Sequence, residues 1–153
     1  MEFSIIKKIP AAKISVLAAA FVLAACAHTP DLIILDSDVS FEFGKAELTP
    51  EGRKQIDMYV PSLVTRGEIR LDVVGHSDRI GSDSANMALS KRRADAVRNQ
   101  LLSSGKLKPE QIKTRGVGPR SPVVYCDQTN QQALIECLAP NRRVEINVQN
   151  VSW

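Results

Sequence analysis

The sequence has little net charge and few aromatic residues, and no basic run in it has aromatic residues between its cations. Its 153 residues include 20 Lys and Arg against 17 Asp and Glu, a formal net charge of +3, and aromatic residues make up 5%. The first 25 residues hold three of these lysines and one glutamate, so they supply +2 of that charge. The +1 left for the rest of the chain gives no electrostatic argument for binding nucleic acid.

The sequence also lacks the residue sets that hydrolases and metal sites require. The motifs HExxH and CxxC are absent, and the two histidines, His28 and His76, lie far apart. We find no paired acid and base and no nucleophile with its base, and both are common needs of catalysis. The sequence therefore predicts a protein that is not an enzyme and holds no metal or cofactor, with His76 as a structural residue.

The apolar run near the N-terminus is too short to span a bilayer. Two basic residues, Lys7 and Lys8, precede a twelve-residue stretch from Ile14 to Ala25 that is apolar except for one serine. A transmembrane helix needs roughly twenty such residues. The pattern favours a cleavable signal peptide over residues 1–25.

The signal peptide ends in Leu23-Ala24-Ala25-Cys26, which resembles the lipobox of bacterial lipoproteins. The resemblance implies cleavage before Cys26, a diacylglycerol on its thiol and a further acyl chain, such as palmitate, on the new amino group. Two or three chains anchor a protein stably, whereas one does not. Ala27, in place of an inner-membrane retention aspartate, favours the outer membrane with the domain facing the periplasm. The alternative is an ordinary signal peptide followed by a chance cysteine.

Lipidation of Cys26 would leave an even number of cysteines. Cys126 and Cys137 are eleven positions apart and flank a polar stretch. In an oxidising compartment this pair suggests a disulfide, which would stabilise the fold by up to about 3 kcal/mol. A zinc site and a redox-active pair have less support, because both histidines are distant in sequence and CxxC is absent.

Hydrophobic periodicity predicts one small α/β domain. Alternation around Val39, Phe41 and Phe43 is typical of a strand. Thr49 and Pro50 are typical of the N-cap and first residue of a helix, and Pro61 is expected to shorten or kink it. This helix should bury Ile56, Tyr59, Val60 and Leu63.

The remaining elements complete a strand-helix-strand-helix-strand-strand order. We expect a strand over 69–73, a helix over 83–104 ended by Gly105, a short strand over 112–117 and a last strand over 143–151. This order predicts a small mixed sheet of about four strands covered by two helices. The domain should occupy residues 37–151, after a lipidated N-terminus and short tether at 26–36.

One stripe of the second helix combines apolar and polar residues. Asn86, Leu89, Arg93 and Val97 follow steps of three and four, and Asp78 comes just before the helix, after a strand. One interpretation is an internal ion pair between Asp78 and Arg93. The other is a zwitterionic ligand, with its ammonium on Asp78 and its carboxylate clamped by Arg93. Backbone N–H groups at the helix start would then add positive potential near that carboxylate.

Several motifs in order resemble the OmpA-like C-terminal domain, which also occurs in Pal lipoproteins and MotB-type stator proteins. Together with the lipobox, this resemblance implies a Pal-like outer-membrane lipoprotein. The resemblance covers roughly residues 37–149, and the loop before Pro140 looks like that of OmpA itself. The motifs are Phe41-Glu42-Phe43-Gly44-Lys45, Gly75-His76-Ser77-Asp78-Arg79-Ile80-Gly81, Arg92-Arg93-Ala94 and Asn141-Arg142-Arg143-Val144-Glu145.

The resemblance implies noncovalent binding to peptidoglycan through the diaminopimelate of its stem peptide. The free end of that residue carries an amino group and a carboxylate on one carbon, which Asp78 and Arg93 would contact respectively. The other implied site residues line or border the same pocket: Asn86, Phe41, Phe43 and Arg142. The family usually has acidic or amide side chains where Glu42 and Gly44 stand here, so a side-chain contact from position 44 is lost.

The leading hypothesis is therefore an outer-membrane lipoprotein that tethers the membrane to the cell wall. Many copies on one membrane would gain avidity. The alternative is an envelope assembly subunit, in a secretion or stator-like complex, that acts mainly through protein contacts. The tether of about ten residues reaches at most roughly 35 Å, so an envelope partner is plausible. A true MotB-like stator is disfavoured, because processing would leave no membrane-spanning helix.

Overall fold

The computed structural model describes residues 31–42 and 44–151. The expected signal peptide over 1–25, the lipidated Cys26 and Phe43 lie outside these residues. Among the helices that are described, none is long and apolar enough to cross a membrane.

Four strands form one mixed sheet in the order β1-β4-β2-β3. Strand β4 runs antiparallel to both β1 and β2, whereas β2 and β3 are parallel. The strands are β1 (Leu32–Asp36), β2 (Ile69–His76), β3 (Ile112–Gly118) and β4 (Arg143–Asn150). The expected mixed α/β architecture is confirmed. The register places the ends of β1, β2 and β3 and the start of β4 at the same end of the sheet.

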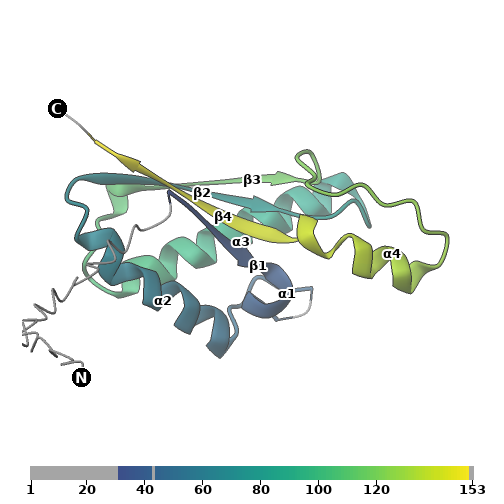
Figure 1. Cartoon of the computed structure of the whole chain (residues 1–153), viewed down its shortest axis with the longest axis horizontal. Helices are drawn as coiled ribbons and strands as arrows, with labels where there is room; N and C mark the ends of the chain where they lie inside the picture. Colours follow the sequence, from purple (N-terminus) through teal and green to yellow (C-terminus); the bar gives the residue numbers. More distant parts are fainter. Residues whose placement is uncertain (1–30, 43, 152–153) are drawn as a thin grey trace, which may run out of the picture.

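The two long helices cover one face of this sheet (Figure 1). Helix α2 (Pro50–Val64) begins as predicted, because the Thr49 hydroxyl accepts a hydrogen bond of 2.9 Å from Gly52 N. Pro61 lies in its last turn, and the helix continues to Val64. Helix α3 (Asp83–Ser103) is capped by Ser82 and followed by Gly105, whose φ of +68° suits glycine.

Short helical segments fill the connections. Helix α1 (Ser37–Ser40) follows β1, and α4 (Gln131–Cys137) lies in the long loop before β4. Figure 1 shows α4 beyond the end of the strands rather than over the face of the sheet. Two 3-10 turns, Pro109–Gln111 and Ala139–Asn141, precede β3 and β4.

The strand expected around Val39, Phe41 and Phe43 is wrong. The first strand lies earlier, at Leu32–Asp36, inside the segment expected to be tether. There Ile33 and Leu35 face the core, while the other face leaves apolar side chains exposed, so simple alternation is hidden in the sequence. Asp36 then caps α1, and Phe41 makes only a single bridge to Leu48. The folded domain therefore begins by Leu32 rather than near Ser37.

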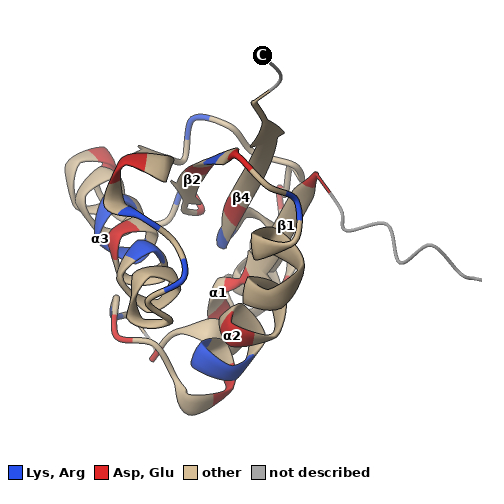
Figure 2. Ribbon diagram, turned by 90° about the vertical axis from the view of Figure 1, so that its left-hand side faces the viewer, with Lys and Arg blue, Asp and Glu red and all other residues tan. Residues whose placement is uncertain are grey.

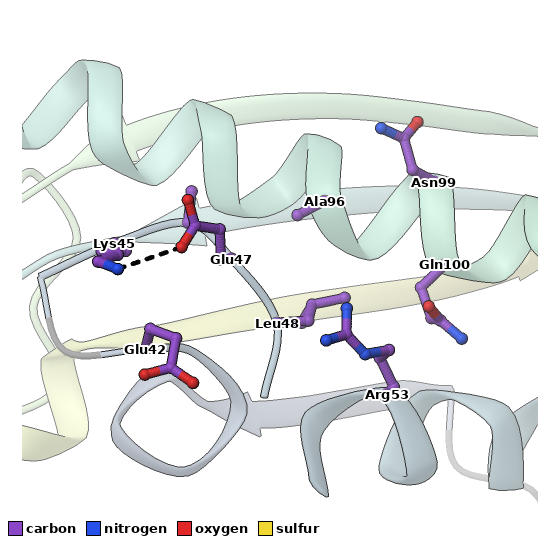
Figure 3. A pocket seen from close by; sticks show the side chains of 9 residues that line it. Glu42, Lys45, Glu47, Leu48, Arg53, Ala96, Asn99 and Gln100 are labelled. Carbon is purple, nitrogen blue, oxygen red and sulfur yellow. Dashed lines mark ion pairs between the residues drawn. The ribbon is translucent and has the colours of Figure 1, made fainter. Parts of the chain in front are cut away.

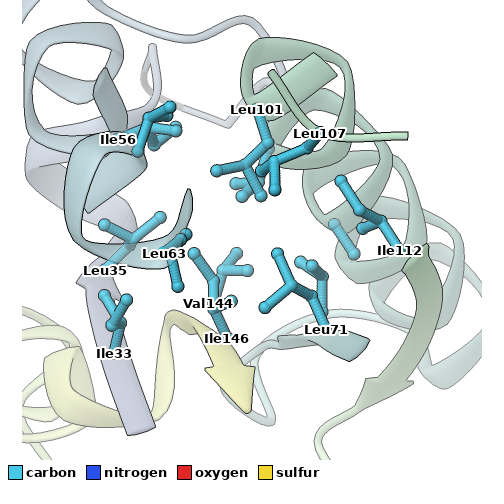
Figure 4. Close-up of a cluster of buried hydrophobic side chains, with 14 of the residues drawn as sticks. Ile33, Leu35, Ile56, Leu63, Leu71, Leu101, Leu107, Ile112, Val144 and Ile146 are labelled. Carbon is cyan, nitrogen blue, oxygen red and sulfur yellow. The ribbon is translucent and has the colours of Figure 1, made fainter. Parts of the chain in front are cut away.

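The hydrophobic core lies between the sheet and the two long helices (Figure 4). Alternate residues of β4, namely Val144, Ile146 and Val148, are buried as predicted. Ile56, Val60 and Leu63 of α2 are also buried, whereas Tyr59 is only partly covered.

Glycines on β2 and β3 let α3 approach the sheet closely. A side chain at Gly75 would overlap the backbone of Ser90, and one at Gly116 would overlap Lys91. The Ser90 hydroxyl also accepts a buried hydrogen bond of 3.0 Å from Gly118 N. This tight fit fixes the position of α3, and therefore of Arg93, relative to the ends of the strands.

Candidate functional site

Four charged side chains meet at the end of the sheet where β2 ends and β4 begins. We call Asp38, Asp78, Arg93 and Arg142 the charge cluster. They come from α1, from the loop after β2, from α3 and from the residue before β4. Two acids and two arginines leave the cluster without net charge. Elsewhere, acidic and basic residues are interspersed along α2 and α3 (Figure 2).

Arg142 is the centre of the charge cluster. Its Nε and Nη2 donate to the two carboxylate oxygens of Asp38 at 2.8 and 2.5 Å. Its Nη1 donates to Asp78 Oδ2 at 2.8 Å and to the Ile135 carbonyl at 3.0 Å. The hydrogen bonds that Arg142 donates to Asp38 and to Asp78, with the charges of these two acids, outweigh burial and raise the pKa of Arg142. Arg142 therefore joins α1 to the loop after β2.

Asp78 is held in place by hydrogen bonds and still has unused acceptor sites on its carboxylate. The loop that carries it starts with a 3.0 Å hydrogen bond from Ser77 N to Gly118 O. Asp78 Oδ1 accepts from Ile80 N at 2.9 Å, and Oδ2 accepts from Arg142. A carboxylate offers about four lone-pair sites, so these two bonds leave part of its acceptor capacity unused. The side chain is 11% exposed.

Arg93 is buried to 4% exposure, yet most of its donors are unused. Its Nε donates to the Lys45 carbonyl at 2.9 Å, and its guanidinium carbon lies 5.1 Å from the centroid of the Phe41 ring. Within residues 31–42 and 44–151, neither terminal nitrogen of Arg93 has a hydrogen-bond acceptor. Neither is among the fully buried unpaired atoms there, so both reach the surface.

The charges around Arg93 shift its pKa in opposite directions. Burial lowers the pKa of Arg93, and Arg142 lowers it further, while Asp38 and Asp78 raise it. Arginine nevertheless stays protonated in proteins. Arg93 is thus a positioned cation with a desolvated stem, which suits a carboxylate.

The structure brings together most of the predicted site residues, but not in the predicted pairing. No ion pair joins Asp78 to Arg93 among the described residues; the partner of Asp78 is Arg142. Asn86 donates to the Ile80 carbonyl at 2.9 Å and so ties α3 to the loop that carries Asp78. Phe41 is buried beneath Arg93 and supports it.

Sequence reasoning missed Asp38, which holds two of the hydrogen bonds of Arg142. Correct placement of β1 would have put Asp38 at the same end of the sheet as Asp78. The backbone of Arg93 lies well inside α3 and not at its start. Arg93 is ten residues beyond Asp83, so its backbone lies about 15 Å along the helix from that end.

Two grooves flank the charge cluster. The α3 groove lies between α3 and the segment before α2 (Figure 3), and the Lys45–Glu47 ion pair of 3.4 Å lies along it. Its lining includes Glu42, Lys45, Leu48, Arg53, Asn99 and Gln100. The disulfide groove lies beside Asp78, and its lining includes Asp78, Arg79, Pro122, Val124, Tyr125 and Leu138.

The loop that forms the disulfide groove contains the one disulfide seen among the described residues. It joins Cys126 to Cys137, the pair expected from the sequence. Over those same residues, no group of three or more His, Cys, Asp or Glu is arranged to hold a metal ion. The charge cluster itself offers charge pairing and hydrogen bonding.

Known proteins share this domain. A model of the OmpA family matches residues 40–136. Outer membrane protein A of Escherichia fergusonii is 44% identical over 122 residues, covering 76% of this chain and 50% of that protein. Outer membrane protein A of Yersinia pseudotuberculosis is 46% identical over 120 residues, covering 75% and 34%. The chain thus spans about a third to a half of the length of these relatives.

Solved structures show the same fold. The peptidoglycan-associated lipoprotein of Burkholderia pseudomallei matches with a TM-score of 0.61 and 23% identity, covering 72% of this chain and 88% of that one. The periplasmic domain of Helicobacter pylori MotB matches with a TM-score of 0.65 and 20% identity, covering 79% and 83%. At these identities the likeness concerns the fold alone. The family match and the 44–46% identity to outer membrane protein A establish that the chain belongs to the OmpA family.

Proposed function

We propose that this protein binds peptidoglycan noncovalently through the diaminopimelate of the stem peptide and catalyses no reaction. One observation carries the proposal: the buried Arg93 keeps two unused donor groups at the surface, in the same charge cluster as Asp78. A ligand with one ammonium and one carboxylate on the same carbon would complement both. The charge cluster has no net charge, and a bound zwitterion would leave it without net charge.

The pairing in the free protein supports this reading of the site. Arg142 already balances Asp38 and Asp78, so neither acid depends on Arg93. Arg93 can therefore give both terminal nitrogens to a carboxylate as parallel hydrogen bonds. An ammonium can use the remaining acceptor sites of Asp78 without displacing Arg142.

The names of the relatives suggest where in the cell envelope this binding would take place. They include outer membrane protein A, at 44% identity, and a solved structure named as a peptidoglycan-associated lipoprotein. Together with the lipobox ending at Cys26, these names favour a lipid anchor in the outer membrane and a domain in the periplasm. The protein would then tether the outer membrane to the cell wall.

An envelope assembly subunit is the second candidate function. Strand β1 lies at the edge of the sheet, and its Leu32 and Ile34 side chains are exposed. Exposed apolar residues on an edge strand favour contact with another protein. A protein partner at this edge would leave the charge cluster open, so the two functions are compatible.

Cosedimentation with insoluble peptidoglycan sacculi tests the proposal. The full chain, purified in mild detergent, is expected to sediment with sacculi and to be released by excess free diaminopimelate. Asp78→Ala and Arg93→Ala should remain in the supernatant, while the matched control Arg92→Ala, an exposed neighbour on α3, should sediment. Circular dichroism checks that each variant is folded. Folded wild type that stays in the supernatant, or variants that sediment equally well, would refute diaminopimelate recognition.

The lipid anchor has its own test. Mass spectrometry of the mature protein should find residues 1–25 removed and acyl chains on Cys26, and Cys26→Ser should abolish the added mass. An unmodified Cys26 would remove the anchor from the proposal without affecting peptidoglycan binding.

A further inference from the structure

The disulfide groove is lined by Asp78 and by residues of the loop that connects β3 to α4. Its lining combines Asp78 and Arg79 with apolar residues, which include Pro122, Val124 and Leu138. Tyr125 borders the groove with 87% of its surface exposed. The groove therefore joins the charge cluster, through Asp78, to a mainly apolar surface.

The walls of this groove are fixed, although the loop has neither helix nor strand between β3 and α4. The Cys126–Cys137 disulfide ties the loop to the end of α4. Arg79 Nη2 donates to the Cys126 carbonyl at 2.7 Å, which ties the loop to the segment that carries Asp78.

The side-chain amide of Asn141 holds the middle of the same loop in place. Its Oδ1 accepts from Val123 N at 2.7 Å and from Val124 N at 3.0 Å, and its Nδ2 donates to the Val124 carbonyl at 2.9 Å. A preformed surface binds a ligand without first losing loop entropy. These ties hold the exposed Tyr125 side chain and the apolar lining in position next to Asp78.

We propose that the disulfide groove binds the part of the stem peptide attached to the zwitterionic residue. This inference rests on the proposed function, because it takes the ligand end at Asp78 and Arg93 as given. The groove chemistry selects a short peptide with small apolar side chains and a second carboxylate. The small side chains pack against Pro122, Val124 and Tyr125. The second carboxylate pairs with Arg79, which uses Nη2 internally and has no ion pair among the described residues.

The α3 groove is a poorer match for such a peptide. Lys45 and Glu47 already pair with each other, and its other labelled side chains are mostly charged or amide groups (Figure 3). It does not include Asp78 in its lining. Arg53 in that groove therefore serves as the matched control for Arg79, and it is exposed, so its removal should not affect folding.

Isothermal titration of the full chain in detergent tests the inference with two probes. One is free meso-diaminopimelate; the other is the tripeptide L-alanyl-γ-D-glutamyl-meso-diaminopimelate. Wild type is expected to bind the tripeptide at least about tenfold more tightly, as two added contacts would give. Tyr125→Ala and Arg79→Ala should each reduce this ratio severalfold without changing the Kd for free diaminopimelate, and Arg53→Ala should preserve it.

The outcomes separate this inference from the proposed function. Wild type that binds both probes equally would overturn the peptide groove and leave diaminopimelate recognition intact. A ratio lost in Arg53→Ala but kept in Tyr125→Ala and Arg79→Ala would also overturn it, since the peptide would then lie in the α3 groove. Wild type that binds neither probe would refute the proposed function, and the inference with it.

Discussion

Two consecutive arginines, one just before β4 and one at its first residue, serve two different polar clusters. Arg142 belongs to the charge cluster, whereas Arg143 belongs to what we call the far-face cluster, with His76 and Glu145 on the face of the sheet opposite α2 and α3. Arg143 Nε donates to Glu145 Oε1 at 2.8 Å, and His76 Nε2 lies 3.5 Å from Glu145 Oε2. Successive side chains on a strand point to opposite faces, so Arg143 and Glu145 lie on the face opposite Val144 and Ile146, which belong to the core.

The clusters differ in where their unused hydrogen-bonding groups lie. In the far-face cluster, Arg143 Nη1 and both ring nitrogens of His76 are buried without a hydrogen-bond partner among the described residues. In the charge cluster, the unused donors of Arg93 reach the surface. A buried unpaired group costs free energy and reaches no ligand, whereas a surface donor held by a buried stem is ready for one. The charge cluster is therefore the better candidate for binding a ligand, whereas the far-face cluster can act only on the stability of the fold, through the largely buried Arg143–Glu145 ion pair.

The largest effect on the free energy of unfolding should come from removing Arg143, the arginine of the far-face cluster. Arg143→Ala leaves the partly buried Glu145 carboxylate without its arginine partner, and we expect a loss of about 3 kcal/mol in the free energy of unfolding. Urea denaturation measures this loss. Arg115→Ala is the control, because its ion pair with Asp72 is largely exposed and should contribute less than about 1 kcal/mol. Equal losses in the two variants would contradict a stabilising role for Arg143.

A smaller effect on stability is expected in the charge cluster. Asp38→Asn keeps the shape of the acceptor but removes the charge paired with Arg142. Asp38 is nearly half exposed, so the loss in unfolding free energy should be about 1 kcal/mol. Binding of diaminopimelate should weaken severalfold, because Arg142 would then compete more strongly for Asp78. A urea melt measures the loss of stability, and a separate titration with diaminopimelate measures the loss of affinity. A variant with unchanged affinity would remove Asp38 from the site.

The smallest effect concerns the pH dependence of stability. Burial, followed by the charge of Arg143, lowers the pKa of His76 below 6.5, although Glu145 opposes the shift. The unfolded chain therefore binds a proton more readily, so the stability that neutral His76 contributes is present above pH 6.5 and is lost as the pH falls below it. His76→Asn should flatten this part of the pH–stability curve measured by urea melts between pH 7.5 and 5. An unchanged slope would show that His76 does not cause it.

Much of the fold could be predicted because local signals agreed with the tertiary structure. The Thr49 cap, the Gly105 terminator and the alternation of β4 each mark an element boundary or face by local chemistry. Strand β1 could not be found this way, because its exposed face is also apolar and gives no alternation. The error displaced the domain start and hid Asp38.

Three of the four residues of the charge cluster were named from the sequence, but their pairing was not. Asp78 and Arg93 stand out because charges near a strand end and on a largely apolar helix stripe need partners. Which cation pairs with Asp78 depends on how β4 lies against β1 and β2, a long-range relation that spacing cannot give. Arg142 was therefore expected at the rim and lies at the centre of the charge cluster.

The most direct test of the account compares two tripeptides that differ only in the zwitterion. L-alanyl-γ-D-glutamyl-meso-diaminopimelate carries both groups at the end of its last side chain, whereas the same tripeptide ending in L-lysine keeps the ammonium and lacks that carboxylate. Titration of the wild type should show at least about tenfold tighter binding of the diaminopimelate peptide. Arg93→Lys, which loses the planar fork, should lose most of that preference. Equal affinity of the wild type for both peptides would contradict a carboxylate contact at Arg93.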